Sequence, residues 1–206
     1  MRMNNETKMD IDFPLLKTFK IDSKTLDFLN RKSRQYFKEC STIPAENEIF
    51  ISDTGQFTSN LLYWSDKEYQ QFLREELVNI ISDLINIPRQ KIDLHYQHIF
   101  DYKKGGYVKP HNHVQKEDFV VIIYLNTCNK GKTSFYLNHR NEYRKRTKVE
   151  ISPIKGNGVC FSSVLFHEAE RTYESKKIFV VGVKIDLLYG EPNKKGFLDK
   201  VKSAIL

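Results

Sequence analysis

Three histidines in the second half of the chain have the type and spacing of metal ligands. His111 and His113 are separated by one residue, and His167 follows a later apolar segment. In an extended segment, residues two apart point to the same face, so both imidazoles of the pair can bind one ion. Three protein ligands on one face of a metal leave positions open for substrate and oxygen. The histidines therefore predict a metal centre with open coordination positions.

Lys177, ten residues after the third histidine, is a candidate anion-binding residue. Lys177 stands directly before the apolar run 178–186, and Lys176 beside it is the competing candidate. A lysine that enters an apolar strand is costly unless its ammonium is paired. A bound carboxylate would pair it through a charge-assisted hydrogen bond. We expect an acid that chelates the metal and reaches the lysine with its far carboxylate.

Helices are expected before these residues in the sequence. Asp22 or Ser23 can cap a helix whose apolar stripe continues to Phe37. A second helix is expected to begin at Ser65, where Ser65 and Glu68 form a capping-box pattern. Apolar residues then recur at helical spacing until Asn86 and Pro88, which are typical helix-ending residues. This stripe indicates packing against a core rather than a ligand site.

From about residue 91 the pattern changes to short strands. Runs rich in β-branched and aromatic residues alternate with Gly, Asn and Lys clusters, which predicts a β-sandwich or barrel. The runs are 94–100, 118–125, 133–138, 148–152, 158–163 and 178–186. The expected organisation is a helical support region over 1–90, a β-barrel region over 91–190, and a tail or short terminal helix over 191–206.

Composition excludes several classes of protein. The chain has 206 residues, 40% of them hydrophobic, which is enough for a real core. Cys40, Cys128 and Cys160 are an odd, widely spaced set that argues against disulfides and against a CxxC metal site. No signal-peptide h-region and no apolar run long enough to span a membrane are visible, so we expect a soluble cytoplasmic protein without membrane partners.

The net charge of +7 is spread too widely to indicate a nucleic-acid-binding face. The densest basic stretch, 139–148, lies between two expected strands and is interpreted as a solvated hairpin. Its functional alternative is a rim that attracts an acidic peptide, a nucleic acid or a nucleotide-like substrate. The oligomeric state cannot be inferred from the sequence.

The order and spacing of the segments over about 94–189 resemble the 2-oxoglutarate- and iron(II)-dependent dioxygenases, in the prolyl-4-hydroxylase-like branch. The matching segments are YKKGGYVKPHNH, FVVIIYLN, GKTSFYLN, ISPIKGNGVCFSS, LFHEAE and KIFVVGVKI. The resemblance implies a double-stranded β-helix, or jelly roll, whose larger sheet is braced by the N-terminal helices. The expected fold class is therefore mainly β with N-terminal helices.

The resemblance also implies roles for single residues. His111 matches the first histidine of the family's HxD motif, and His167 matches the distal histidine. Lys177 matches the basic residue that binds the far carboxylate of 2-oxoglutarate, and Tyr102 matches a tyrosine that often hydrogen-bonds it. The implied cofactors are Fe(II), with 2-oxoglutarate and O2 as cosubstrates. The implied products are succinate, carbon dioxide and a hydroxylated substrate, for which a peptidyl proline is the first candidate and a small molecule the other.

The family's aspartate falls on His113, so the chain has HxH where HxD is expected. A neutral imidazole does not cancel a unit of the metal's charge, whereas a carboxylate does. Glu117 and Asp118 lie close by in sequence, and either could approach the metal or bind substrate. His95 and His98, three residues apart, are on opposite faces of a strand and are expected to be structural.

Two other functions remain open on the sequence alone. One is a cupin-like enzyme that holds iron or zinc with three histidines and does not use 2-oxoglutarate. The other is a non-catalytic binding module that kept the barrel and lost productive metal chemistry.

Overall fold

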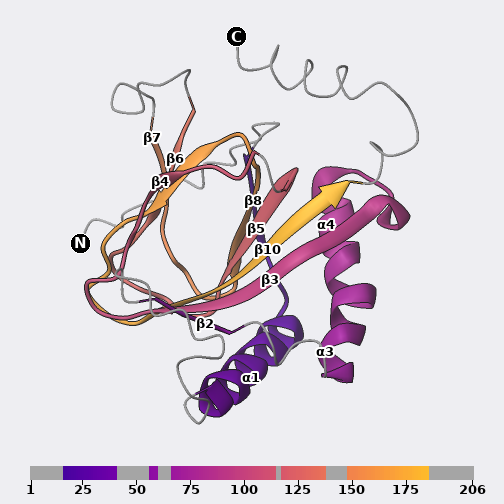
Figure 1. Ribbon diagram of the computed structural model, residues 1–206, viewed down its shortest axis with the longest axis horizontal. Helices are drawn as coiled ribbons and strands as arrows, with labels where there is room; N and C mark the ends of the chain where they lie inside the picture. The colour runs from indigo at the N-terminus through magenta and orange to yellow at the C-terminus, as the bar shows by residue number, and fades with distance from the viewer. Residues whose placement is uncertain (1–15, 41–55, 60–65, 115–116, 138–147, 186–206) are drawn as a thin grey trace, which may run out of the picture.

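The computed structural model describes residues 16–40, 56–59, 66–114, 117–137 and 148–185 (Figure 1). The helical elements are α1 (Ser23–Cys40), α3 (Lys67–Phe72), the π-helical turn η1 (Leu73–Leu77), α4 (Val78–Ile85) and the 3-10 turn η2 (Arg89–Lys91). The strands are β1 (Leu16–Lys20), β2 (Gln56–Ser59), β3 (Ile92–Tyr102), β4 (Val108–His111), β5 (Phe119–Tyr124), β6 (Thr133–Tyr136), β7 (Lys148–Ile151), β8 (Asn157–Ser162), β9 (Phe166–Ala169) and β10 (Lys176–Ile185).

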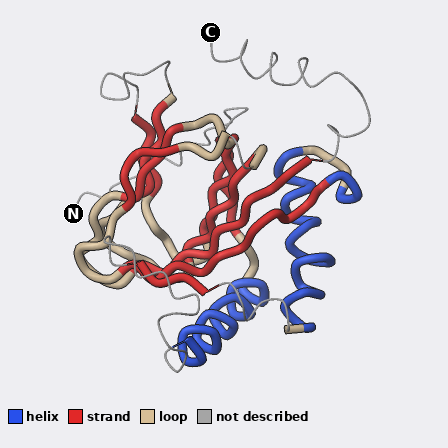
Figure 2. The backbone as a smooth tube through the Cα atoms, viewed as in Figure 1, coloured by secondary structure: helices blue, strands red, loops and turns tan. Residues whose placement is uncertain are grey.

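The strands form two antiparallel sheets that face each other (Figure 2). The larger sheet has the order β1-β8-β5-β10-β3-β2, and the smaller has the order β4-β9-β6-β7. Consecutive strands of the chain repeatedly alternate between the sheets, as in a double-stranded β-helix. The expected jelly roll is confirmed, and each expected strand run corresponds to an observed strand.

The helices cover the outer face of the larger sheet (Figure 1). Tyr69, Leu77 and Ile81 of this layer pack with Val121 and Phe179 of the sheet in one buried cluster. The alternate residues of the same strands, such as Val120 and Ile178, belong to a second cluster between the two sheets. Strands β5 and β10 are therefore buried on both faces, which explains why they appear in the sequence as nearly continuous apolar runs.

The N-terminal region is more than a helical support. Its strand β1 pairs with β8, and its strand β2 pairs with β3, so it supplies both edges of the larger sheet. The two segments, LKTFK and QFTS, are short and partly polar, which gives little strand signal.

Helix starts and ends follow local capping chemistry. The Asp22 side chain accepts hydrogen bonds from the backbone N–H and hydroxyl of Thr25, as expected for a cap of α1. The capping box at Ser65 and Glu68 is corrected: Asp66 caps α3 by accepting from the N–H of Tyr69. Asn86 ends α4, as the sequence predicts, and it does so in the left-handed conformation, with a φ of 54°.

Several expectations concern parts of the chain beyond this description. Ser65, most of the basic segment 139–148 and the tail 191–206 lie outside the described residues.

Cys128 and Cys160 are buried and form no disulfide, in accord with reduced structural cysteines. Burial raises the pKa of the Cys160 thiol to about 12.

A buried ion pair joins α1 to the start of α3. The Nζ of Lys32 lies 2.5 Å from Asp66 Oδ2 and 2.8 Å from Glu68 Oε2, and its side chain is 4% exposed. Lys32→Ala is expected to lower the free energy of unfolding by about 3 kcal/mol, because it leaves the Asp66 carboxylate without its salt-bridge partner in a poorly solvated place, where the hydrogen bonds from the Tyr36 hydroxyl and a backbone N–H do not neutralise it. Arg31→Ala removes a neighbouring, half-exposed pair with Glu68 and should cost less than about 1 kcal/mol. Urea denaturation of both variants measures the difference, and equal losses would contradict it.

Candidate functional site

The three predicted histidines meet on the inner face of the smaller sheet. His111 ends β4 and pairs in register with His167 on β9, while His113 follows two residues later. The centroids of the His111 and His167 rings are 4.3 Å apart, and those of His113 and His167 are 5.2 Å apart. One ligand atom from each residue falls within 4.8 Å of the others. This spacing is suited to a single ion held by three imidazoles.

Backbone contacts orient the rings. The Nδ1 of His111 lies 2.9 Å from the carbonyl oxygen of Lys109, and the Nδ1 of His167 lies 3.2 Å from that of Leu165. A histidine that donates Nδ1–H to a carbonyl keeps Nε2 as its ligand atom, which is the usual arrangement at metal sites. The backbone N–H of His113 donates to the carbonyl of Ser163 at 2.9 Å, which fixes the chain after β4 against the loop before β9.

The surroundings of His111 and His167 favour neutral imidazoles. His167 is 5% exposed, and its pKa lies well below the usual value because of burial and the two neighbouring rings. Burial also lowers the pKa of His111. Neutral imidazole is the form that binds metal, and nitrogen ligands suit Fe(II) as well as zinc. The donor set therefore fits a bound iron(II) ion.

The two nearby acidic residues differ in position. Glu117 is buried, and its Oε2 lies 3.0 Å from the Nδ1 of His113. The Asp118 side chain instead accepts a hydrogen bond from the backbone N–H of Ile185 at 2.8 Å and holds the end of β10. Within the described ranges, the candidate donor set contains the three histidines and neither carboxylate.

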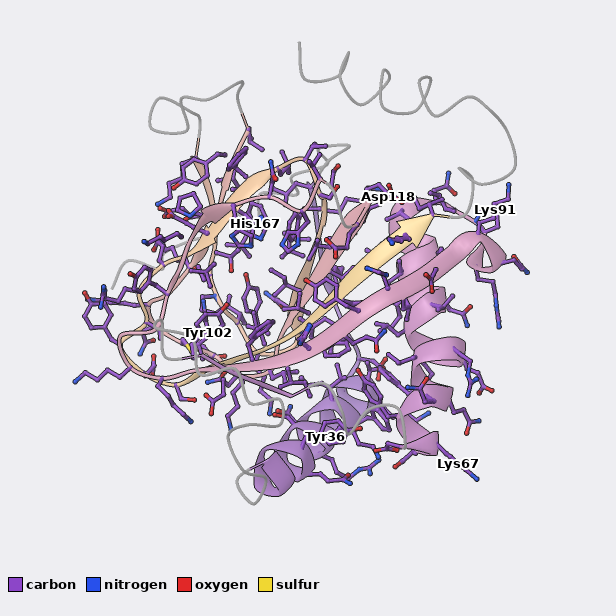
Figure 3. All side chains as sticks on the ribbon, viewed as in Figure 1. Tyr36, Lys67, Lys91, Tyr102, Asp118 and His167 are labelled. Atoms are coloured by element: carbon purple, nitrogen blue, oxygen red, sulfur yellow. The ribbon has the colours of Figure 1, made fainter. Side chains whose placement is uncertain are left out.

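A small cavity of about 140 Å³ adjoins the triad. Ala169 follows His167 by two residues on β9 and lines the same cavity, roughly 7 Å farther along the strand. It lies next to Thr133, its paired residue on β6, which also lines the cavity. His167 and Tyr102, labelled in Figure 3, come from opposite sheets. The remaining wall is mainly apolar. The lining residues are Tyr96, Phe100, Tyr102, Val108, His111, His113, Val120, Ile122, Thr133, His167, Ala169, Ile178 and Val180.

The two candidate lysines lie on opposite faces of β10. Ile178 and Val180 line the cavity, so strand alternation places Lys176 on the cavity side. Lys177 projects from the same face of β10 as Phe179, which packs under the helices. The backbone N–H of Lys177 donates to the side chain of Asn126. The geometry thus favours Lys176 over Lys177, the residue expected from the sequence, as the cation that faces the barrel interior.

Lys176 is fully buried beside Tyr102. Its Nζ lies 4.6 Å from the centroid of the Tyr102 ring and donates a hydrogen bond of 2.8 Å to the carbonyl of Gly131. Desolvation lowers the pKa of Lys176 to about 8. A carbonyl does not neutralise an ammonium, so an anionic ligand would relieve the cost of this buried charge.

Tyr102 and Thr133 complete this end of the cavity. Tyr102 is buried, and desolvation raises the pKa of its hydroxyl, which keeps it protonated as a donor. The Tyr124 hydroxyl donates to Thr133 Oγ1 at 2.8 Å. Thr133 was not selected from the sequence, and its only signal was its place at the start of an expected strand.

Comparison with solved structures places this geometry in a known fold. A prolyl-4-hydroxylase from Pseudomonas putida superimposes with a TM-score of 0.60 at 15% identity, over 82% of this chain and 92% of that chain. The chain has the fold of the 2-oxoglutarate- and iron(II)-dependent oxygenases. The oxygenase fold is thus shown by similarity of structure and not by sequence: no family model and no characterised protein sequence matches the chain.

Other members of this oxygenase fold act on different molecules. A Trichoplax adhaerens prolyl hydroxylase, in complex with a peptide of hypoxia-inducible factor, has a TM-score of 0.61 at 15% identity over 83% of this chain and 84% of that chain. The alpha-ketoglutarate-dependent carbocyclase SnoK of nogalamycin biosynthesis has a TM-score of 0.66 at 11% identity over 95% and 91%. None of the helices in the described residues is long and apolar enough to cross a membrane.

Proposed function

We propose that the chain is an iron(II)- and 2-oxoglutarate-dependent oxygenase that hydroxylates an unactivated C–H bond. His111, His113 and His167 would hold the metal, while Lys176 and Tyr102 would bind the far carboxylate of the cosubstrate. The observation that supports this most directly is a three-histidine cluster on the wall of a small cavity, together with a buried ammonium that contacts Tyr102 of the same wall.

The chain's own residues have three tasks in this reaction. Bound iron would supply the activation of O2, coupled to conversion of 2-oxoglutarate to succinate and carbon dioxide, with the second oxygen atom entering the product. The histidine rings fix the place of the metal, and Lys176 fixes the orientation of the cosubstrate through charge pairing. Apolar wall residues such as Val120, Ile122 and Val180 exclude water from the reacting groups.

The size of the cavity limits what it can hold. Its 140 Å³ is below the roughly 300–1,000 Å³ of sites that bury a drug-sized ligand. A five-carbon dicarboxylate is small enough, whereas most of a larger substrate must stay at the mouth and present only its reacting carbon. A peptidyl proline is the first substrate to test, by analogy with the prolyl hydroxylases of this fold. A small molecule is the second.

Succinate formation tests the proposal. The protein is loaded with Fe(II) without oxygen, then given 2-oxoglutarate, O2 and a set of proline-containing peptides. We expect stoichiometric iron and succinate that depends on 2-oxoglutarate and oxygen. Iron-loaded protein that gives no succinate with or without the peptides would count against this function.

The three-histidine donor set favours one second candidate. A cupin-like metal enzyme uses the same donors without 2-oxoglutarate. If His167→Ala abolishes activity on its substrate while Lys176→Ala leaves it unchanged, this second function replaces the first.

The affinity for 2-oxoglutarate is expected to fall as the pH rises above about 8. Lys176, whose pKa is about 8, is charged below that pH and binds the carboxylate, and above it the neutral amine does not. The dissociation constant should approach a tenfold rise per pH unit in alkaline buffer until the bound-state pKa is reached. Titrations from pH 6.5 to 9.5 measure it, and Lys176→Arg should flatten the profile because guanidinium stays charged. A flat wild-type profile would contradict the assignment.

A further inference from the structure

We propose that Glu117 is a positioning residue that, through His113, supplies the negative charge which the HxH motif lacks. The inference rests on the proposed function of the triad as an iron site. In it, a His113–Glu117 dyad takes the place of a single carboxylate ligand: the imidazole binds the metal and the carboxylate lies one layer behind.

The contact between the two side chains is close and buried. The Oε2 of Glu117 lies 3.0 Å from the Nδ1 of His113, and the Glu117 side chain is 2% exposed. The backbone N–H of Glu117 also donates to the carbonyl of His113 at 3.2 Å, so the two residues are joined through the backbone as well as through their side chains. Buried carboxylates in proteins are paired or bind metals, and this one lies against the His113 imidazole, which would carry the positive charge of a bound metal.

The Glu117 side chain packs against the larger sheet at Gly182 of β10. A Cβ on Gly182 would lie 2.6 Å from Cγ of Glu117 and 2.3 Å from the ring of Tyr96. Only glycine therefore leaves room for both side chains at this point of β10. The Tyr96 ring in turn lies 6.4 Å from the His113 ring at an angle of 19°. Glu117 and Tyr96 together restrict the orientation of His113.

The triad is asymmetric in a way that matches the departure from HxD. The Nδ1 atoms of His111 and His167 are hydrogen-bonded to backbone carbonyls, whereas the Nδ1 of His113 lies 3.0 Å from a carboxylate oxygen. The carboxylate thus backs the one ligand that stands where an aspartate is expected. A carboxylate behind a ligating histidine increases the basicity of the ring and fixes its direction, and its loss typically weakens metal binding about 10–100-fold.

Metal affinity and redox potential test the role without requiring turnover. In Glu117→Gln, which keeps the shape and removes the charge, we expect Fe(II) binding to weaken about 10–100-fold in an anaerobic competition with a chelator. The Fe(III)/Fe(II) potential should rise, by about 59 mV for each tenfold loss of preference for Fe(III). Glu117→Asp keeps the charge at a shorter reach and should give intermediate values. Glu168→Gln is the matched control, because Glu168 adjoins His167 but contacts Tyr136 and Lys148.

Repeating Glu117→Gln in a His113→Asp variant tests whether Glu117 acts through the His113 imidazole. His113→Asp places a carboxylate directly at the metal, so Glu117 becomes a like charge behind it. There Glu117→Gln should no longer weaken Fe(II) binding. Iron binding that is equal in the wild type, Glu117→Gln and Glu168→Gln would overturn the dyad. Failure of the wild type itself to bind Fe(II) would instead refute the iron site and the proposed function with it.

Discussion

Lys176→Ala is expected to weaken 2-oxoglutarate binding by about 100-fold, which corresponds to about 2.7 kcal/mol. The residue is fully buried against the ring of Tyr102, which lines the cavity, so the variant leaves the far carboxylate in a desolvated place without its cation. Metal binding should be unchanged, because Lys176 is not part of the histidine cluster. Titration of metal-loaded protein with 2-oxoglutarate gives the dissociation constant.

Lys177→Ala is the matched control for this prediction. The two lysines are adjacent in sequence but project from opposite faces of β10, and only Lys176 is fully buried. The Lys177 variant should bind 2-oxoglutarate within about twofold of the wild type, since exposed or outward positions contribute little. Reversal of the two results would restore the original expectation for Lys177 and contradict the strand parity.

His167→Ala is expected to remove iron binding and, with it, succinate formation. His167 is the most buried of the three candidate ligands, and its ring contacts both other histidines. Loss of a direct ligand should exceed the 10–100-fold effect of losing a residue behind one. Iron stoichiometry after anaerobic reconstitution measures the result.

His95→Ala is the control for the loss of a histidine as such. His95 is exposed and lies on β3, outside the cluster. The variant should bind iron at the wild-type ratio. Equal iron content in His167→Ala and the wild type would mean that the metal, if bound, is held elsewhere.

The strands of the barrel were predictable where they are long and buried on both faces. Runs such as 118–125 and 178–186 are short, rich in β-branched residues and apolar at successive positions, which favours a strand between two layers. The short strands β4 and β9, which bring the histidines together, contain proline, histidine and glutamate and give no apolar alternation. Their positions follow from pairing with each other, which depends on the whole barrel.

The kinds of residue that form the candidate site were predictable from the sequence, but not every individual residue was. The three histidines were identified by spacing and resemblance, and the structure brings them together. The choice between Lys176 and Lys177 depends on which face of β10 turns inward, and a run that is apolar on both faces hides that parity. The contact of Glu117 with His113 depends on the space left by Gly182, which is distant in sequence and has no local signature near Glu117.

The hydrogen bond between Tyr124 and Thr133 determines which ligands the deep end of the cavity can accept. Tyr124 donates to Thr133 Oγ1, so the hydroxyl proton of Thr133 is left to point elsewhere, and Lys176 has only donors. With the Tyr102 hydroxyl, these groups favour an acceptor that carries charge. An acid that ends in a carboxamide would bring its own N–H groups against the ammonium and lose the charge pairing. The same few atoms that would bind a dicarboxylate would therefore discriminate against its amide, a molecule of nearly identical shape.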